Sequence, residues 1–377
     1  MLPEVRGSGD RPLRIALVGA LVAGVETHFN NVSRVAEAQP FIQPVSVPVR
    51  PYRDDVLERT AWMLPPNIRG TLRSIAGTAP LFTSRSLDAV WSQLDLPLLP
   101  WMLTWNAGRR IPVIYSADST PALARGFAGH YGDWAGGSPL KRRLRDHLHG
   151  LMLRRCAAVS AWTLWAARSM REDYGVDPSR LHVIPPGVDT SLWELPKPRT
   201  IQSRPVRILF VGGDFQRKGG DLLVEVYRQR LRHVAEIDFV TRSDALTPEP
   251  GFRVHAGLGP NDQRLIKLYG DADIFVLPTR ADCFSVAGME AMAAGLPVIT
   301  CPVGGVGELF TDGVHGIFVP PDDGRALAEA VSALVSDEHR RLAMGAAAQA
   351  LARSRYDIEA NTLRLLGLLD STQAVAA

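Results

Sequence analysis

Short apolar runs rich in β-branched residues alternate with amphipathic segments along the first half of the chain. The strand-like runs are RIALVGAL, QPVSVPV, AVWSQL, IPVIYSAD and CAAVSA, and AGVETHFNNVSRVAEA has the apolar spacing of a helix. Strands that alternate with helices form parallel sheets covered on both faces. The pattern therefore predicts an α/β fold with a parallel sheet.

The alternation restarts after a proline-rich stretch, residues 185–205, which is the best candidate for a linker. The strand-like runs there are RILFVGG, EIDFVT, DIFVLPT and PVITCPV, and the helical ones are GDLLVEVYRQ, NDQRLIKLYG and SVAGMEAMAAG. Residues 326–369 are helical at a period of about 3.6. Two successive α/β halves are thus predicted, each resembling a Rossmann domain.

Composition supports a folded protein of two domains. The chain has 377 residues, of which 46% are hydrophobic and 21% charged. A net charge of +3 leans towards anionic ligands or an anionic surface, but it is too small to indicate nucleic acid. Three scattered cysteines, without a CxxC pair or metal spacing, suit a reducing compartment.

Targeting signals are not evident in the sequence. The first twenty residues lack the basic-then-apolar order of a signal peptide, and no run reaches eighteen apolar residues. We therefore expect a cytoplasmic protein, with any membrane contact made from the inner face.

A basic, glycine-rich loop follows the first strand of the second half. In VGGDFQRKGGD, residues 211–221, Arg217 and Lys218 stand between two glycine pairs, and the second pair opens a helix. Glycines let backbone approach a ligand closely, and a helix start offers free N–H groups to an anion. The loop suits a diphosphate, or it is a flexible basic turn. Its spacing matches neither a P-loop nor a dinucleotide fingerprint.

Two acids flank the start of an apolar helix in ADCFSVAGMEAMAAGLPVI, residues 281–299. Phe284 and Ser285 mark the predicted helix start, and the N–H groups of Ser285 and Val286 can bind phosphate with help from the helix dipole. Asp282 and Glu290, eight positions apart, can then bind hydroxyls of the same ligand. Alternatively, Asp282 is an ordinary cap and Glu290 a solvated helix residue.

Three segments in this order resemble the donor half of the retaining GT-B glycosyltransferases of family four (glycosyl transferases group 1): GGDFQRKGGDLLVEVY, YGDADIFVLPTRADCFSVAGMEAMAAGLPVI and VGGVGELFTDGVHGIFVPPDD. In the first half, AGVETHF, with Gly24, resembles that family's Gly-Gly-x-Glu loop, and LHVIPPGVD resembles the segment closing its first domain. The resemblance implies two Rossmann-like domains facing a cleft. We expect an acceptor-binding domain over 1–195, a donor-binding domain over 196–350, and a C-terminal helix, 351–377, that packs back on the first domain.

The resemblance also implies roles for the donor-side residues. Glu290 would hold the donor ribose and Asp282 the transferred sugar, Lys218 would bind phosphate, and the backbone of Ser285 and Val286 would take the distal phosphate. Two positions depart from the family pattern. The first acid of the pair is Asp282 instead of Glu, so its side chain is shorter by one methylene.

The second departure is Gly213, which occupies the place of the family's usual Arg. We expect Arg217 to substitute for that Arg.

On the acceptor side, Asp118 occupies the place where many relatives have a histidine close to the reacting sugar. It would bind the donor sugar or orient the acceptor hydroxyl, or else it initiates the turn before Ser-Thr-Pro. His28 and Tyr131 either face the cleft or pack inside the domain.

Asp271 and Asp273 form an Asp-x-Asp triplet of the kind that holds a metal in glycosyltransferases of another fold. Relatives have a structural acid here, so we interpret the triplet as structural and predict no metal and no cofactor. UDP-sugar is favoured over GDP-sugar as the donor.

Residues 139–155, PLKRRLRDHLHGLMLRR, place Leu140, Leu144, Leu148 and Met152 on one helical face among many cations. One interpretation is an interfacial helix that reaches a lipid-linked acceptor on an anionic leaflet. The other, which we favour, is a domain helix that packs these residues inward.

The function expected from the resemblance is a retaining, metal-independent hexosyltransferase that acts on a glycan or lipid-linked acceptor in polysaccharide or glycolipid synthesis. Asp118, Arg217, Lys218 and Asp282 would be its catalytic residues, through front-face attack with the leaving diphosphate taking the acceptor proton. The alternatives are a non-catalytic GT-B scaffold or partner subunit, and a GT-B phosphorylase or epimerase.

Overall fold

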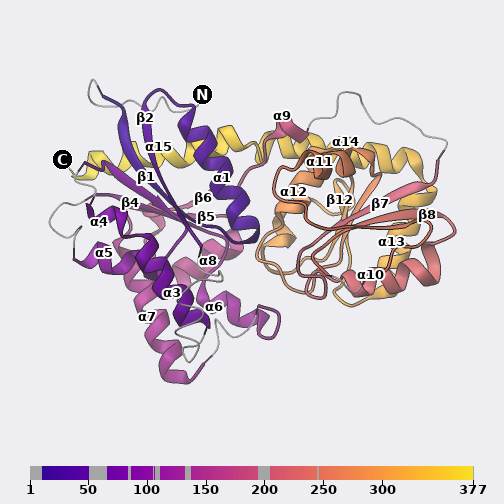
Figure 1. Ribbon diagram of the computed structural model, residues 1–377, viewed down its shortest axis with the longest axis horizontal. Helices are drawn as coiled ribbons and strands as arrows, with labels where there is room; N and C mark the ends of the chain where they lie inside the picture. The colour runs from indigo at the N-terminus through magenta and orange to yellow at the C-terminus, as the bar shows by residue number, and fades with distance from the viewer. Residues whose placement is uncertain are drawn as a thin grey trace. The chain divides into compact units, whose positions relative to one another are not determined.

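The computed structural model describes residues 11–50, 66–83, 86–104, 106, 111–131, 137–193, 204–243 and 246–376 (Figure 1). The chain forms two compact units, which are described separately. Unit 1 comprises Met1–Pro186 and Ile358–Ala377, and unit 2 comprises Gly187–Asp357.

Unit 1 is built on a six-stranded parallel sheet with the order β2-β1-β3-β4-β5-β6. Its strands are β1 (Leu13–Ala20), β2 (Ile42–Val49), β3 (Ala89–Ser92), β4 (Val113–Ala117), β5 (Ala158–Ala161) and β6 (Leu181–Val183). Its helices are α1 (Ala23–Glu37), α3 (Pro66–Gly77), α4 (Pro80–Thr83), α5 (Leu99–Leu103), α6 (Pro121–Ala124), α7 (Pro139–Arg155), α8 (Leu164–Glu172) and α15 (Ile358–Ala376), with short 3₁₀ turns at Leu96–Leu98, Arg125–Phe127 and Pro178–Arg180.

The two-residue period of the strands divides the core of unit 1 into two layers. Ile15 and Leu17 of β1 pack in one layer with residues of α1 and α15. Ala16 and Val18 point to the opposite face, into a layer shared with α7 and α8. The apolar runs of the sequence therefore become strands buried on both faces, as a parallel sheet requires.

Unit 2 repeats this architecture with the sheet order β12-β11-β10-β7-β8-β9, again all parallel. Its strands are β7 (Val206–Val211), β8 (Ala235–Val240), β9 (Phe252–His255), β10 (Ile274–Leu277), β11 (Val298–Thr300) and β12 (Gly316–Phe318). Its helices are α9 (Thr190–Trp193), α10 (Gly220–Val226), α11 (Gln263–Asp271), α12 (Val286–Ala293), α13 (Gly324–Ser336) and α14 (Glu338–Arg355), with a π-helical turn at Tyr227–Leu231 and a 3₁₀ turn at Gly304–Glu308.

The structure confirms the predicted fold class of two parallel α/β sheets. Each predicted strand and helix is present within a few residues, whereas the short strands β6, β9 and β12 were not predicted. Each has only three or four residues and lies at or beside a sheet edge. A pattern with a period of two residues has too few repeats in such a strand to stand out.

The chain passes between the units at residues 186/187 and 357/358, where the sequence suggested 195/196 and 350/351. The first boundary differs because α9 packs on α12 of unit 2, and its Trp193 ring lies edge-on to the ring of Tyr269 on α11. Residues 194–203 of the expected linker lie outside the described residues.

Candidate donor and acceptor sites

The donor-side residues predicted from sequence meet where the strand order of unit 2 reverses. β7 lies between β8 and β10, so chain direction across the sheet switches between β7 and β10. The loops that follow these two strands contact each other: the Arg280 N–H donates to the Arg217 carbonyl at 2.9 Å, and Arg217 Nη1 donates to the Ala281 carbonyl at 2.8 Å. Ligands of open α/β sheets bind at such switch points.

Gly219 allows this close approach. Its φ is +73°, and a Cβ at this position would lie 2.0 Å from the carbonyl oxygen of Pro278 in the neighbouring loop. Any larger residue would push the two loops apart. The glycine therefore sets the position of Lys218, the residue before it.

Lys218 and Asp282 form an ion pair across the two loops, between Nζ and Oδ2. The lysine side chain is 15% exposed and the aspartate side chain 7% exposed. Two residues far apart in the sequence, both predicted to bind the donor, are thus brought together. An anionic ligand here would compete with Asp282 for the ammonium group.

Arg217 makes hydrogen bonds to other residues of unit 2. Its Nε donates to Asp214 at 2.9 Å, and its Nη1 bonds the Ala281 carbonyl, leaving the side chain 14% exposed. A different cation lies beside Gly213. A Cβ on that glycine would be 2.9 Å from Nε of Arg242, an exposed residue just after β8.

Arg242 was not predicted as a site residue. The polar loop TRSDA was visible in the sequence, but no local pattern connects it with Gly213, which lies on the loop after another strand. The sequence contains one indication that another cation lies here. Gly213, at the family's arginine position, has no side chain and so leaves room for one from another loop.

Helix α12 begins at Val286, beside the same loops. Ser285 is its N-cap, and its hydroxyl accepts a hydrogen bond from the Gly288 N–H at 3.1 Å. The alternative role of Asp282 as the cap is therefore wrong. Val286 stands in the first turn, where helical N–H groups have no intrahelical acceptor. Phe284 is buried beside the ring of Tyr356.

Glu290 lies on the buried side of α12 and is 5% exposed, so the alternative of a solvated helix residue is wrong. The Tyr269 hydroxyl donates to its Oε2 at 3.0 Å. Burial raises the pKa of the Glu290 carboxyl to about 7, although the Tyr269 hydrogen bond lowers it in part. Tyr269, on α11, was not predicted because only the fold brings it to Glu290.

The Asp-x-Asp triplet makes internal ion pairs. Asp273 accepts hydrogen bonds from Arg204 at 2.6 Å and from the Arg207 N–H at 2.8 Å, and Asp271 pairs with Lys267 at 2.7 Å. These contacts agree with a structural role. In the part of the chain that the structure describes, no group of three His, Cys, Asp or Glu residues is arranged to hold a metal ion.

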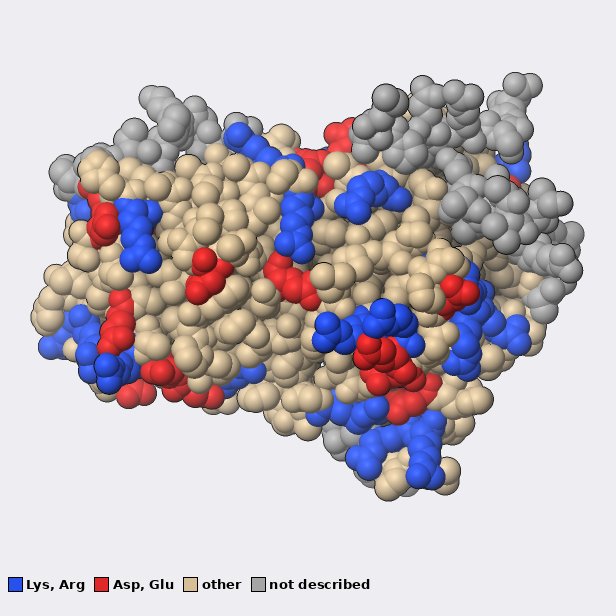
Figure 2. All heavy atoms as spheres, turned by 180° about the vertical axis from the view of Figure 1, so that it is seen from behind, with Lys and Arg blue, Asp and Glu red and all other residues tan. Residues whose placement is uncertain are grey.

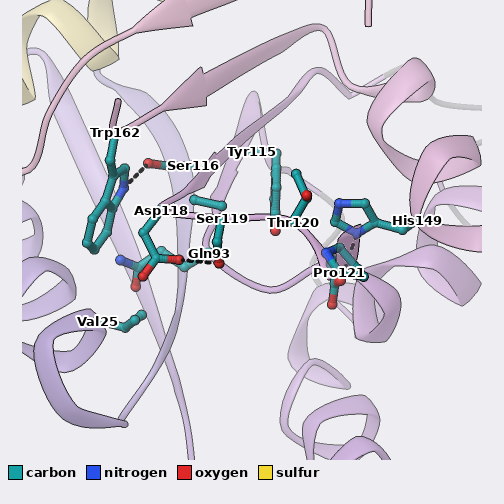
Figure 3. Close-up of a pocket in the computed structure, with 12 residues that line it drawn as sticks. Val25, Gln93, Tyr115, Ser116, Asp118, Ser119, Thr120, Pro121, His149 and Trp162 are labelled. Carbon is teal, nitrogen blue, oxygen red and sulfur yellow. Dashed lines mark hydrogen bonds and ion pairs between the residues drawn. The ribbon is translucent and has the colours of Figure 1, made fainter. Parts of the chain in front are cut away.

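A pocket of about 210 Å³ lies at the carboxyl ends of β1, β3 and β4 in unit 1 (Figure 3). The strand order of this unit reverses at the same point, between β1 and β3. Asp118 lines the pocket and accepts a hydrogen bond from the Ser119 hydroxyl at 3.0 Å. Figure 3 shows Gln93 on the same side of the pocket as these two residues.

The other side of this pocket contains a histidine that was not predicted. His149, on α7, is 1% exposed, and its Nδ1 lies 2.9 Å from Oδ2 of Asp95, which follows β3. Both residues line the pocket, together with Tyr115. Burial by itself raises the pKa of Asp95, but the hydrogen bond and charge of His149 help to hold it below its usual value.

Three further residues predicted for the site in the first half of the chain, Gly24, His28 and Tyr131, are not among the residues that line this pocket. His28 packs edge-on against the rings of Trp91 and Trp162, and burial lowers its pKa to about 3. Tyr131 is half-buried, beside the ring of Phe127. Gly24 lies in the first turn of α1, next to Val25 of the pocket.

Residues 139–144, at the start of α7, are all exposed. Leu140 is 77% exposed and Leu144 58% exposed, which contradicts the expectation that they pack inward; only Met152 is fully buried and Leu148 partly so. Figure 2 shows basic side chains gathered at the bottom of unit 1, where Figure 1 places α7. Among the described residues, no helix is long and apolar enough to cross a membrane.

Comparison with known proteins identifies both halves of the chain. Residues 22–192 match the family model for Glycosyltransferase Family 4, and residues 205–337 match the model for Glycosyl transferases group 1. The two matches follow the two units closely.

Curated relatives are glycosyltransferases. A D-inositol 3-phosphate glycosyltransferase of Xylanimonas cellulosilytica is 31% identical over 219 residues, which cover 52% of this chain and 52% of that protein. An MMP alpha-(1->4)-mannosyltransferase of Mycolicibacterium hassiacum is 31% identical over 189 residues, covering 47% and 45%. The chain thus spans about half the length of the curated relatives it matches.

Solved structures share the fold over nearly the whole chain. A sucrose-phosphate synthase from Thermosynechococcus elongatus superposes with a TM-score of 0.71 at 16% identity, over 97% of this chain and 100% of that one. HepE of Anabaena, in complex with UDP-glucose, gives 0.65 at 14% identity, over 96% and 99%. With these two matched domains on two parallel α/β sheets, the chain belongs to the GT-B glycosyltransferases of group 1 and family 4.

Proposed function

We propose that this glycosyltransferase takes its sugar from a nucleotide diphosphate sugar, with UDP favoured, and transfers it with retention of configuration to a hydroxyl of a glycan or lipid-linked acceptor. The observation that carries the proposal is the Lys218–Asp282 pair, held between two loops at the switch point of unit 2. A cation for phosphate and a carboxylate for sugar hydroxyls stand side by side there. HepE of Anabaena, a structural neighbour, has been solved with UDP-glucose.

In the proposed reaction, Lys218 and the first turn of α12 stabilise the leaving diphosphate, and Asp282 orients the sugar. The bond from the anomeric carbon to the diphosphate oxygen breaks as the acceptor oxygen attacks on the same face. The departing diphosphate oxygen takes the acceptor proton. Positioning and electrostatic stabilisation are sufficient to account for a large rate enhancement in such a site.

The first test is calorimetric binding of UDP, GDP and ADP, with and without Mg²⁺. We expect one nucleotide, UDP, to bind clearly and independently of the metal ion. Lys218→Ala should weaken that binding and lower turnover by orders of magnitude. The matched control is Lys267→Ala, an exposed lysine paired with Asp271 on the surface of the same unit. Undiminished turnover in Lys218→Ala, or no binding of any nucleotide, would favour a non-catalytic scaffold.

We also propose that the exposed end of α7 brings the protein to an anionic lipid surface. Leu140 and Leu144 project next to Lys141, Arg142 and Arg143, all of them exposed. Leucines beside cations are typical of helices that lie in the interface of an anionic leaflet.

A further inference from the structure

The pocket of unit 1 contains buried polar atoms that lack hydrogen-bond partners. Nε2 of His149 and both amide atoms of Gln93 have no partner among the described residues, and both side chains line the pocket. An unpaired buried polar group is unfavourable, because the loss of its hydration is not offset by a hydrogen bond. Three such atoms around one cavity therefore point to a ligand that completes their hydrogen bonds.

The charges around the pocket are acidic. Asp95 and Asp118 both line it, and the described lining residues include no lysine or arginine. Burial raises the pKa of Tyr115 well above its ordinary value, so its hydroxyl stays protonated at neutral pH. A phosphate dianion would be repelled by the two carboxylates, and the His149 imidazole is already paired with Asp95.

We propose that this pocket binds an uncharged polyol ring of the acceptor, through Gln93 and His149, and rejects a phosphate monoester on that ring. A hydroxyl both donates and accepts, so it can pair with an amide, an imidazole nitrogen and a carboxylate in turn. A cavity of about 210 Å³ is small for a drug-sized ligand and suits a single sugar-like ring. The role of this ring as acceptor rests on the function proposed above.

The proposal separates this chain from relatives whose names specify D-inositol 3-phosphate. Those proteins, by name, use a phosphorylated polyol. The described lining of this pocket favours the unphosphorylated counterpart.

The test is ligand-observed NMR titration of the full chain with two matched pairs of probes. The pairs are myo-inositol against D-inositol 3-phosphate, and methyl α-D-glucoside against glucose 6-phosphate. We expect each neutral probe to bind at least about tenfold more tightly than its phosphorylated partner. Asp118→Asn should narrow that difference by improving binding of the phosphorylated probes.

Two glutamine variants test whether the neutral probes bind in this pocket. Gln93→Leu keeps the shape of the side chain and should weaken binding of the neutral probes about tenfold, whereas Gln229→Leu, at an exposed site in unit 2, should change nothing. Tighter or equal binding of the phosphorylated probes overturns the proposal. So does failure of both neutral probes to bind, or wild-type affinity in Gln93→Leu.

Calorimetric UDP binding, measured on the same samples, keeps the two proposals distinguishable. Normal UDP binding without polyol discrimination contradicts only the pocket inference. Polyol discrimination without UDP binding contradicts only the donor assignment.

Discussion

A buried carboxyl such as Glu290 is costly to ionise, and its position on α12 therefore lowers the stability of the unliganded protein at neutral pH. Its pKa of about 7 in the folded state compares with an ordinary value of 4.5. The unfolded chain loses this proton first as the pH rises. Folding stability consequently falls between about pH 4.5 and 7, and it stays lower above that window.

We predict that Glu290→Gln raises the free energy of unfolding by roughly 2–3 kcal/mol near pH 8, because the amide carries no charge to bury. Near pH 5 the gain should largely disappear, since the native carboxyl is then protonated. The same variant should weaken UDP binding if the carboxylate holds the ribose. Urea unfolding followed by circular dichroism at both pH values, and calorimetry, measure the two effects.

Glu225→Gln, at an exposed position in unit 2, is the control and should be neutral at both pH values. An equal gain from Glu290→Gln near pH 5 and pH 8 would contradict the assignment of the effect to ionisation.

The two arginines near the donor loops, Arg217 and Arg242, should contribute differently to UDP binding and to stability. Arg217 joins Asp214 to the Ala281 carbonyl, whereas Arg242 is exposed beside Gly213. We predict that Arg242→Ala weakens UDP binding about tenfold with an unchanged melting temperature. Arg217→Ala should lower both turnover and melting temperature, because the loop loses internal hydrogen bonds.

Arg230→Ala, at another exposed arginine of unit 2, controls for loss of general positive charge. If Arg242→Ala binds UDP like the wild type while Arg217→Ala binds it poorly at full stability, Arg217 alone replaces the family's arginine.

At the scale of elements, α7 carries two different surfaces along one helix. Its C-terminal half is anchored in the core through Met152 and Leu153, and its N-terminal half projects with Leu140 and Leu144 exposed. The helical spacing of these leucines is the same throughout, so periodicity alone could not distinguish the buried half from the exposed half.

We predict that full-length protein sediments with vesicles containing phosphatidylserine and much less with vesicles of phosphatidylcholine alone. Raising the salt concentration should weaken this binding, because each cation near an anionic surface contributes about 1 kcal/mol. The double variant Leu140→Ser, Leu144→Ser should lower the affinity for these vesicles at least about tenfold.

Leu164→Ser is the matched control, because Leu164 is 64% exposed at the start of another helix of unit 1. Equal binding to neutral vesicles, or loss of binding in the control alone, would rule out the role assigned to α7.

For the whole molecule, the sequence predicted those features that depend on a local pattern of residues. The strands of both sheets, apart from the short edge strands β6, β9 and β12, and the helix at Val286 follow from runs of neighbouring residues. The pairs Tyr269–Glu290 and Asp95–His149 were not predicted, because each joins residues that are close only after the chain folds. The same is true of Arg242 beside Gly213.

Unit 1 is built from two separate segments of the chain, because α15 follows unit 2 in the sequence and packs on one face of the unit 1 sheet. Leu366 is 1% exposed there, in the same layer as Ile15 and Leu17. Unit 2, in contrast, is a continuous segment. A cavity in the α15 layer should therefore destabilise unit 1 and leave the nucleotide site in unit 2 intact.

We predict that Leu366→Ala lowers the free energy of unfolding of unit 1 by about 2–5 kcal/mol. All tryptophans except Trp193 lie within the residue range of unit 1, so tryptophan fluorescence during urea unfolding reports mainly on that unit. Its midpoint should shift to lower urea, while the affinity for UDP in buffer stays at the wild-type value. A parallel loss of UDP affinity would mean that the donor site depends on the packing of α15, and the two units would then have to be treated as one cooperative structure.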